Sequence, residues 1–142
     1  MVFRKLVLSS VLSVNLGYTF FLFPLLGILL PGNVPFTVYN LLAFMLVDSV
    51  WGIVLGTVIY LLVRLTGMSL TRAVTFSTAA LWAVSWLTSI LSTGDLGAIT
   101  LDQVAIIGID GIAALITWFT LSKLARHYII GQSASTETNA PE

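Results

Sequence analysis

The chain has 142 residues, of which 58% are hydrophobic and only 8% are charged. Soluble domains carry about 25% charged residues, and a small protein has much surface relative to its volume, so a water-soluble fold would lack the polar surface it needs. There is no basic stripe for a nucleic acid, and the absence of cysteine excludes disulfides and thiolate chemistry. A single histidine leaves little scope for a metal centre, so we expect neither a metal nor another cofactor.

Four apolar stretches are long enough to cross a bilayer, because a helix needs roughly 20 residues to span a hydrocarbon core of about 30 Å. These stretches cover residues 6–30, 36–63, 73–92 and 103–125. Segments rich in proline or glycine, 31–35 and 93–97, separate the first stretch from the second and the third from the fourth. We therefore predict an all-α membrane protein, a bundle of four transmembrane helices surrounded by membrane lipid.

The first stretch follows Arg4 and Lys5, as the apolar region of a signal peptide does. It is too long for such a region, and no cleavage site with small residues follows it. We therefore predict a permanent span over residues 6–30, kinked near its outer end by Pro24.

Basic residues fall on one side of the membrane once the four spans are drawn, and the six of them are Arg4, Lys5, Arg64, Arg72, Lys123 and Arg126. The opposite loops carry only Asp95 and Asp102. The positive-inside rule makes the basic side cytoplasmic, so we expect both termini there, in a protein of the cell membrane. Residues 131–142 are polar and cannot bury a core. We predict that they form a disordered cytoplasmic tail after a membrane domain of residues 1–130.

The two halves of the chain resemble each other weakly. A shift of 62 residues aligns Asp48 with Asp110 and Arg64 with Arg126 without a gap. This alignment predicts two helical hairpins repeated in the same orientation, as in many transporters. The alternative is that two membrane hairpins are alike in composition alone.

Asp48 and Asp110 each interrupt an apolar stretch. An aspartate near the centre of a span costs about 2.5–3.5 kcal/mol on insertion scales, so it normally faces protein or water and needs a partner. Counted along the helix, Asp48 lies about 18 Å and Asp110 about 13 Å from the outer end of its span. We expect both carboxyls to be protonated unless a cation is near.

Helical spacing predicts where these aspartates point. Asp48, Gly52 and Gly56 recur every four residues and share one face, and the two glycines let another helix approach closely. We therefore predict a packed interface there, with a counterpart around Asp110. The polar side chains expected at a similar depth, as hydrogen-bond partners, are Asn15, Tyr18, Ser85 and Ser89.

Three functions remain open. The first is a non-catalytic protein that acts through helix packing, as an accessory subunit or a small homo-oligomer, because no soluble domain, nucleophile–base pair or cofactor motif is present. The second is a small transporter or channel coupled to protons or cations through Asp48 and Asp110. The weakest is an intramembrane hydrolase, since aspartyl proteases of that kind carry Tyr-Asp and Gly-x-Gly-Asp motifs that this sequence lacks.

Overall fold

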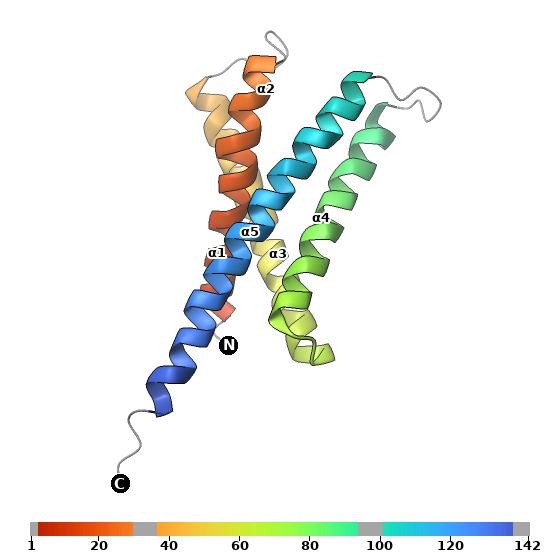
Figure 1. Cartoon of the computed structure of the whole chain (residues 1–142). Helices are drawn as coiled ribbons and strands as arrows, with labels where there is room; N and C mark the ends of the chain where they lie inside the picture. The colour runs from red at the N-terminus through yellow and green to blue at the C-terminus, as the bar shows by residue number, and fades with distance from the viewer. Residues whose placement is uncertain (1–2, 30–36, 94–100, 138–142) are drawn as a thin grey trace.

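The computed structural model describes residues 3–29, 37–93 and 101–137. The described residues form four helices and no strand. Figure 1 shows that consecutive helices run in opposite directions, so that each joins its successor alternately at the upper and the lower end of the bundle. The predicted all-α class is therefore confirmed for this part of the chain.

The first helix is continuous but contains a wide turn in its middle. It consists of α1 (Phe3–Val14), the π-helical segment η1 (Asn15–Leu22) and α2 (Phe23–Leu29). At the end of η1, the backbone N–H of Phe23 donates to the carbonyl oxygen of Tyr18. Pro24 follows directly, and a proline ring clashes with the carbonyl four residues earlier while offering no N–H. A π turn accommodates that clash, and such turns are frequent at functional sites.

α3 (Val38–Thr66) begins and ends with ordinary capping chemistry. The Thr37 side chain accepts a hydrogen bond from the backbone N–H of Asn40 at 3.2 Å. Gly67 follows the last turn in the left-handed conformation, with a φ of 68°, which glycine adopts without steric cost. A short turn then leads directly into α4 (Leu70–Thr93).

Three helices are long and apolar enough to cross a membrane, namely Phe3–Leu29, Val38–Thr66 and Val104–His127. The third of these lies within α5 (Leu101–Glu137), which includes the first residues of the predicted tail. α4 is absent from this set among the described residues, so the fourth predicted span is not confirmed. Residues 138–142 of the predicted tail lie outside the described part.

The first helix lies at the centre of the packing, since it contacts both α3 and α5 extensively. Gly52 and Gly56 of α3 face α1, which is the helix that approaches the glycine face. A Cβ atom at Gly52 would lie 2.5 Å from Val11 Cα, and one at Gly56 would lie 2.8 Å from Val7 Cα. The two backbones therefore meet directly, which only glycine permits.

On its other side, the first helix packs against α5 through Gly17. A Cβ atom there would overlap Thr117 Oγ1 and the carbonyl of Ala113. Ala113, Ala114 and Thr117 are all buried, so the face predicted around Asp110 does pack. Its neighbour is the first helix as well as α4, whereas a simple repeat of hairpins would give it α4 alone.

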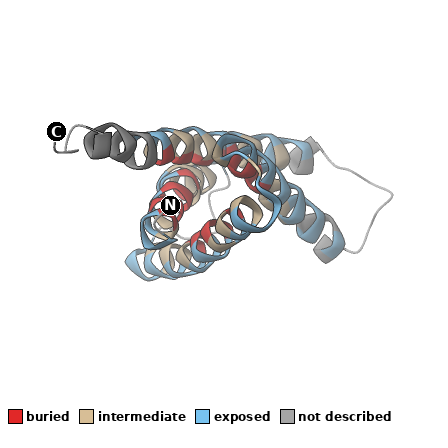
Figure 2. Cartoon of the chain, turned by 90° about the horizontal axis from the view of Figure 1, so that it is seen from below, coloured by how far each residue is buried: buried red, intermediate tan, exposed pale blue. Residues whose placement is uncertain are grey.

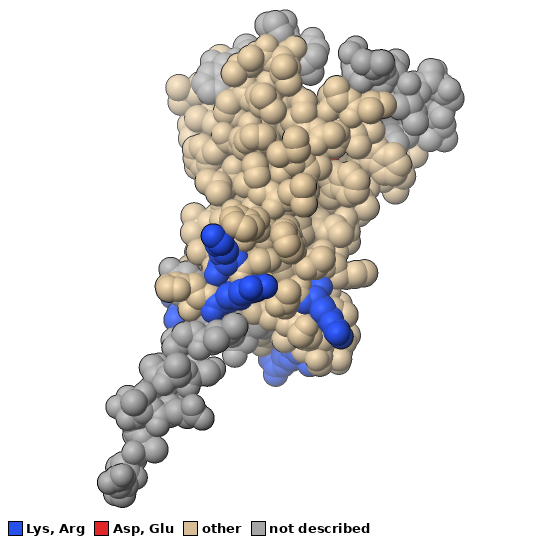
Figure 3. All heavy atoms as spheres, viewed as in Figure 1, with Lys and Arg blue, Asp and Glu red and all other residues tan. Residues whose placement is uncertain are grey.

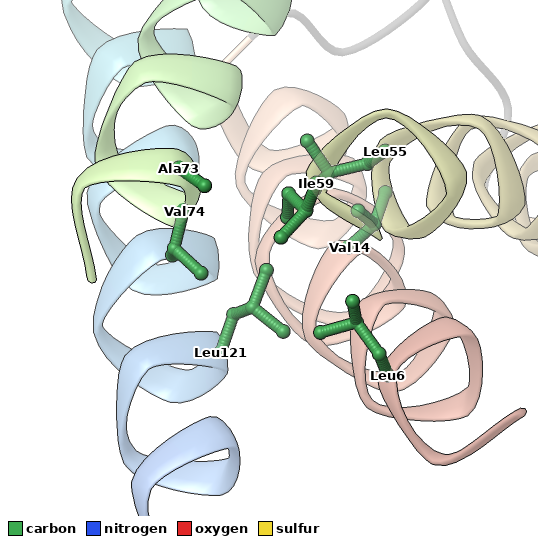
Figure 4. Close-up of a cluster of buried hydrophobic side chains, with 7 residues drawn as sticks. All are labelled: Leu6, Val14, Leu55, Ile59, Ala73, Val74 and Leu121. Carbon is green, nitrogen blue, oxygen red and sulfur yellow. The ribbon is translucent and has the colours of Figure 1, made fainter. Parts of the chain in front are cut away.

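The apolar core lies where all four helices meet, toward the lower end of Figure 1. Figure 4 shows its seven side chains converging from the four helices, and they are Leu6, Val14, Leu55, Ile59, Ala73, Val74 and Leu121. Buried residues line the inner faces of the helices, and the outward faces are exposed (Figure 2). Many of those exposed side chains are large and hydrophobic, Leu12, Leu46 and Ile28 among them, as expected for a surface in contact with lipid.

Basic side chains gather at one end of the bundle. On the face drawn in Figure 3, the Lys and Arg side chains lie at the lower end and the upper part carries none. This end holds the start of α1, the turn from α3 to α4, and the lower part of α5.

Candidate functional site

Asp48 lies on the buried face of α3, one helical turn before Gly52. Its side chain is 7% exposed. The glycine contact brings the first helix close to this face, and the Thr19 hydroxyl donates a hydrogen bond of 2.5 Å to Asp48 Oδ2. Asp48 is therefore held at the interface between the two helices, as its spacing from Gly52 and Gly56 predicts.

A chain of polar side chains extends from this carboxyl. Thr19 Oγ1 lies 3.2 Å from Asn15 Oδ1, and the amide nitrogen of Asn15 donates to Ser49 Oγ at 3.1 Å. Ser49 in turn donates to the Met45 carbonyl oxygen at 2.6 Å. The chain crosses twice between the first helix and α3, so it links the two helices as well as Asp48.

When Asp48 is protonated, each donor in this series of hydrogen-bonded side chains has an acceptor. The carboxylic acid then donates to Thr19, Thr19 donates to Asn15, and Asn15 donates to Ser49. If Asp48 is ionised, the single Thr19 proton must turn to the carboxylate, and Asn15 Oδ1 loses its donor. Binding or release of one proton at Asp48 therefore rearranges hydrogen bonds along the first helix.

Asp110 lies on α5 and faces the same part of the first helix. Its carboxyl hydrogen-bonds to the Ser85 hydroxyl of α4 and interacts with the Tyr18 hydroxyl of the first helix. Asp110 is half-buried, whereas Asp48 is almost completely buried. Three helices thus surround the second carboxyl.

Tyr18 connects the two aspartates. Its hydroxyl interacts electrostatically with both Asp110 and Asp48. The oxygen is buried, and no described atom completes a hydrogen bond to it at full geometry. The Tyr18 hydroxyl is therefore a buried donor that faces Asp110 and lies within electrostatic range of Asp48.

Two consecutive residues of η1 serve different helices. Thr19 reaches Asp48 on α3, and Tyr18 reaches Asp110 on α5. Successive side chains leave a helix in clearly different directions, about 100° apart in an α-helix, so one segment can face two neighbouring helices. The π-helical segment that precedes Pro24 therefore carries the residues that reach both aspartates.

A pocket of about 190 Å³ opens beside Asp48, between the first helix, α3 and α4. Tyr18 and Ser85 line it together with Asp48, so it reaches one aspartate and the partners of the other. Phe44 and Trp51 add aromatic walls. No Lys, Arg or His in the described part of the chain acts on either carboxyl.

The structure therefore brings together most of the predicted polar residues. One region of the bundle is surrounded by Asp48, Asp110, Tyr18 and Ser85. Asn15 is connected to this region through Thr19, which hydrogen-bonds to both Asn15 and Asp48. The side chain of Ser89 lies outside the described residues.

Sequence reasoning did not identify Thr19 as the direct partner of Asp48, or Ser49 as the partner of Asn15. Thr19 follows Asn15 by four residues and so shares its helical face, which is a signal that the sequence does contain.

In comparisons with protein-family models, curated proteins and solved structures, no match to this chain was found.

Proposed function

We propose that this protein is a small transporter or channel that binds protons or cations at Asp48 and Asp110. One observation carries the proposal: two acidic side chains from different helices face the same π-helical segment, and the Tyr18 hydroxyl interacts electrostatically with both. Two aspartates that served only to join helices would not need a shared tyrosine. Acidic residues inside spans commonly mark ion or proton pathways.

The hydrogen bonds favour the proton as the ion bound at Asp48. When the Asp48 carboxyl is neutral, each donor in the series of hydrogen bonds that ends at the Met45 carbonyl oxygen has an acceptor. Release of the proton breaks this series. Asp110 can receive the proton through Tyr18 or through a water molecule. Movement of the ion between the two carboxyls is the step that we assign to this site.

The proposed topology has four spans, with α4 as the fourth. A hydrogen bond joins α4 to α5: Trp118 Nε1 on α5 donates to Thr75 Oγ1 on α4 at 2.9 Å. Several of its hydroxyls donate to their own helix carbonyls, which lowers their cost in lipid; examples are Thr75, Thr78 and Thr88. The basic end of the bundle would then face the cytoplasm, with both termini and the tail.

Proton flux in liposomes tests the proposal. We expect the wild-type protein to dissipate an imposed pH gradient, and Asp48→Asn and Asp110→Asn each to lower the rate by at least about tenfold, as expected when a general proton carrier is removed. Asp102→Asn, at the start of α5, makes the same chemical change in the first turn of that helix and should keep the wild-type rate. Equal rates for wild type and the double variant Asp48→Asn with Asp110→Asn would refute the role of the two carboxyls.

A second candidate is a packing subunit or homo-oligomer, and the groove between α4 and α5 favours it. This groove has a volume of about 580 Å³ and is lined by small residues such as Ala79, Gly108 and Gly111. A further helix, from a second copy or from a larger membrane complex, would fill it. Mass measurement in lipid nanodiscs over a range of protein-to-lipid ratios tests this candidate, and a monomer at every ratio would count against the homo-oligomer.

A further inference from the structure

The pocket beside Asp48 combines an acid with aromatic walls. It has a volume of about 190 Å³, and its lining includes Asp48, Tyr18, Phe44 and Trp51. The hydroxyls of Ser85 and Thr88 add polar groups on the α4 side. Its remaining walls are aliphatic, so Asp48 is the one carboxyl in the lining.

The charge of an ionised Asp48 has no counter-charge within the described residues. Asp48 is more than nine-tenths buried, and Thr19 is the hydrogen-bond donor found for it there. When the proton leaves, a negative charge remains in a low-dielectric site, which is costly unless a cation takes the place of the proton. The pocket is the space next to the carboxyl that such a cation can occupy.

The lining favours an organic cation over a metal ion. Calcium and magnesium need six or more oxygen ligands in a suitable geometry. The described residues contain no group of three His, Cys, Asp or Glu side chains able to hold a metal. Aromatic faces, in contrast, attract quaternary ammonium groups through the ring quadrupole, and this attraction is strongest where water is excluded.

The volume limits the size of the cation. A water molecule occupies about 30 Å³ in the liquid, so the pocket holds roughly six groups of that size. Drug-sized ligands occupy pockets of about 300–1,000 Å³. A compact ammonium ion such as choline fits this limit, and a tetrabutylammonium ion does not.

We infer that the pocket lined by Asp48, Tyr18, Phe44 and Trp51 binds a small organic cation of the quaternary ammonium class, with its charge against Asp48. This inference rests on the proposed function, because the organic cation and the proton then occupy the same carboxyl in turn. It goes beyond that function in naming the class of substrate whose movement is coupled to the proton.

Equilibrium dialysis of isotopically labelled choline against the full-length protein in nanodiscs tests the inference. We expect saturable binding that unlabelled choline displaces and that 3,3-dimethylbutan-1-ol, its uncharged analogue of the same shape, does not. Tetrabutylammonium should also fail to displace it. These comparisons use the wild-type protein alone, so they do not depend on whether any variant folds.

Variants then locate the site. Asp48→Asn should weaken choline binding by about 100-fold or more, the effect of removing one partner of a buried charge pair. Trp51→Leu should weaken it by roughly tenfold through loss of the aromatic face. Trp86→Leu is the matched control, because Trp86 is exposed on α4 and is not part of the pocket lining, and it should bind as wild type does.

Each outcome decides between the two proposals. Displacement by the uncharged analogue, or equal weakening by Trp51→Leu and Trp86→Leu, would overturn the cation site. Proton flux that depends on Asp48 without choline binding would leave the proposed function standing and refute this inference. Choline binding that depends on Asp48 without proton flux would support the site and refute proton transport.

Discussion

The two helical hairpins use glycine in opposite ways. In the first hairpin, formed by the first helix and α3, Gly52 and Gly56 meet the backbone of α1, and a Cβ atom at either position would overlap it. In the second, formed by α4 and α5, a Cβ atom at Gly108 would meet nothing within 4 Å. Glycines about one helical turn apart, Gly52 and Gly56 in one hairpin and Gly108 and Gly111 in the other, therefore line a closed interface in the first and an open groove in the second.

The difference follows from the surface that each glycine face meets. Val7 and Val11 on α1 leave the backbone accessible, so two helices can touch. On α4 the bulky Trp82 faces Gly111, and a Cβ atom there would lie 3.6 Å from the indole nitrogen. α5 also shares its buried face with the first helix through Thr117. Small residues thus permit close packing, but the opposite helix decides whether it occurs.

Substituting one glycine in each hairpin gives the largest expected contrast. Gly52→Ala places a methyl group against the backbone at Val11, so α1 and α3 must separate, and overpacking of this kind costs about 1–3 kcal/mol. Gly108→Ala fills open space and removes the helix penalty of glycine, so stability should stay the same or rise by up to about 1 kcal/mol.

Unfolding by SDS in mixed micelles, followed by circular dichroism, measures both changes. Because the two variants add the same methyl group, composition cannot explain a difference between them. Equal destabilisation by Gly52→Ala and Gly108→Ala would contradict the contrast between the hairpins.

A second pair compares two fully buried threonines. Thr19→Val leaves the Asp48 carboxyl without its hydroxyl partner, which should cost about 1 kcal/mol. Thr117 donates to the Ala113 carbonyl of its own helix and to the Ser13 carbonyl, and those carbonyls have helical N–H donors as well. Thr117→Val should therefore cost less than about 0.5 kcal/mol.

The same unfolding assay measures this pair, and valine keeps the shape of threonine in both variants. An equal loss would mean that the bond from Thr19 to Asp48 contributes no more to stability than a bond within a helix. In the flux assay, Thr19→Val should also slow the wild-type rate, while Thr117→Val should not.

The helices and the packed face of Asp48 could be predicted from the sequence, because hydropathy, turn residues and a spacing of four determine them locally. The length of the apolar runs predicts four spans, and three helices of the described residues are long and apolar enough to cross a membrane, with α4 outside that set. The spacing of Asp48, Gly52 and Gly56 predicts the contact with another helix.

Neighbours in space could not be predicted in the same way. Nothing local indicates that α5 packs on the first helix as well as on α4, because small residues fit either partner. Pro24 predicts a disturbance of the first helix, but not that it takes the form of a π-helical segment, or that Tyr18 and Thr19 of this segment reach different aspartates. The site therefore depends on which helices pack together, and that is not encoded in a simple period.

The smallest expected effect separates two tryptophans within the second hairpin. Trp118 Nε1 donates to Thr75 Oγ1, whereas Trp82 Nε1 is buried with no hydrogen-bond partner among the described residues. Both variants, Trp118→Phe and Trp82→Phe, lose similar ring area, so the difference between their free energies of unfolding measures the contribution of the indole N–H groups. Trp118→Phe should be less stable than Trp82→Phe by about 0.5–1 kcal/mol. The first variant loses the hydrogen bond to Thr75, whereas the second loses a buried N–H group that has no acceptor among the described residues. Equal stability of the two in the unfolding assay would show that lipid or a further partner satisfies Trp82, and so that the groove is occupied in the membrane.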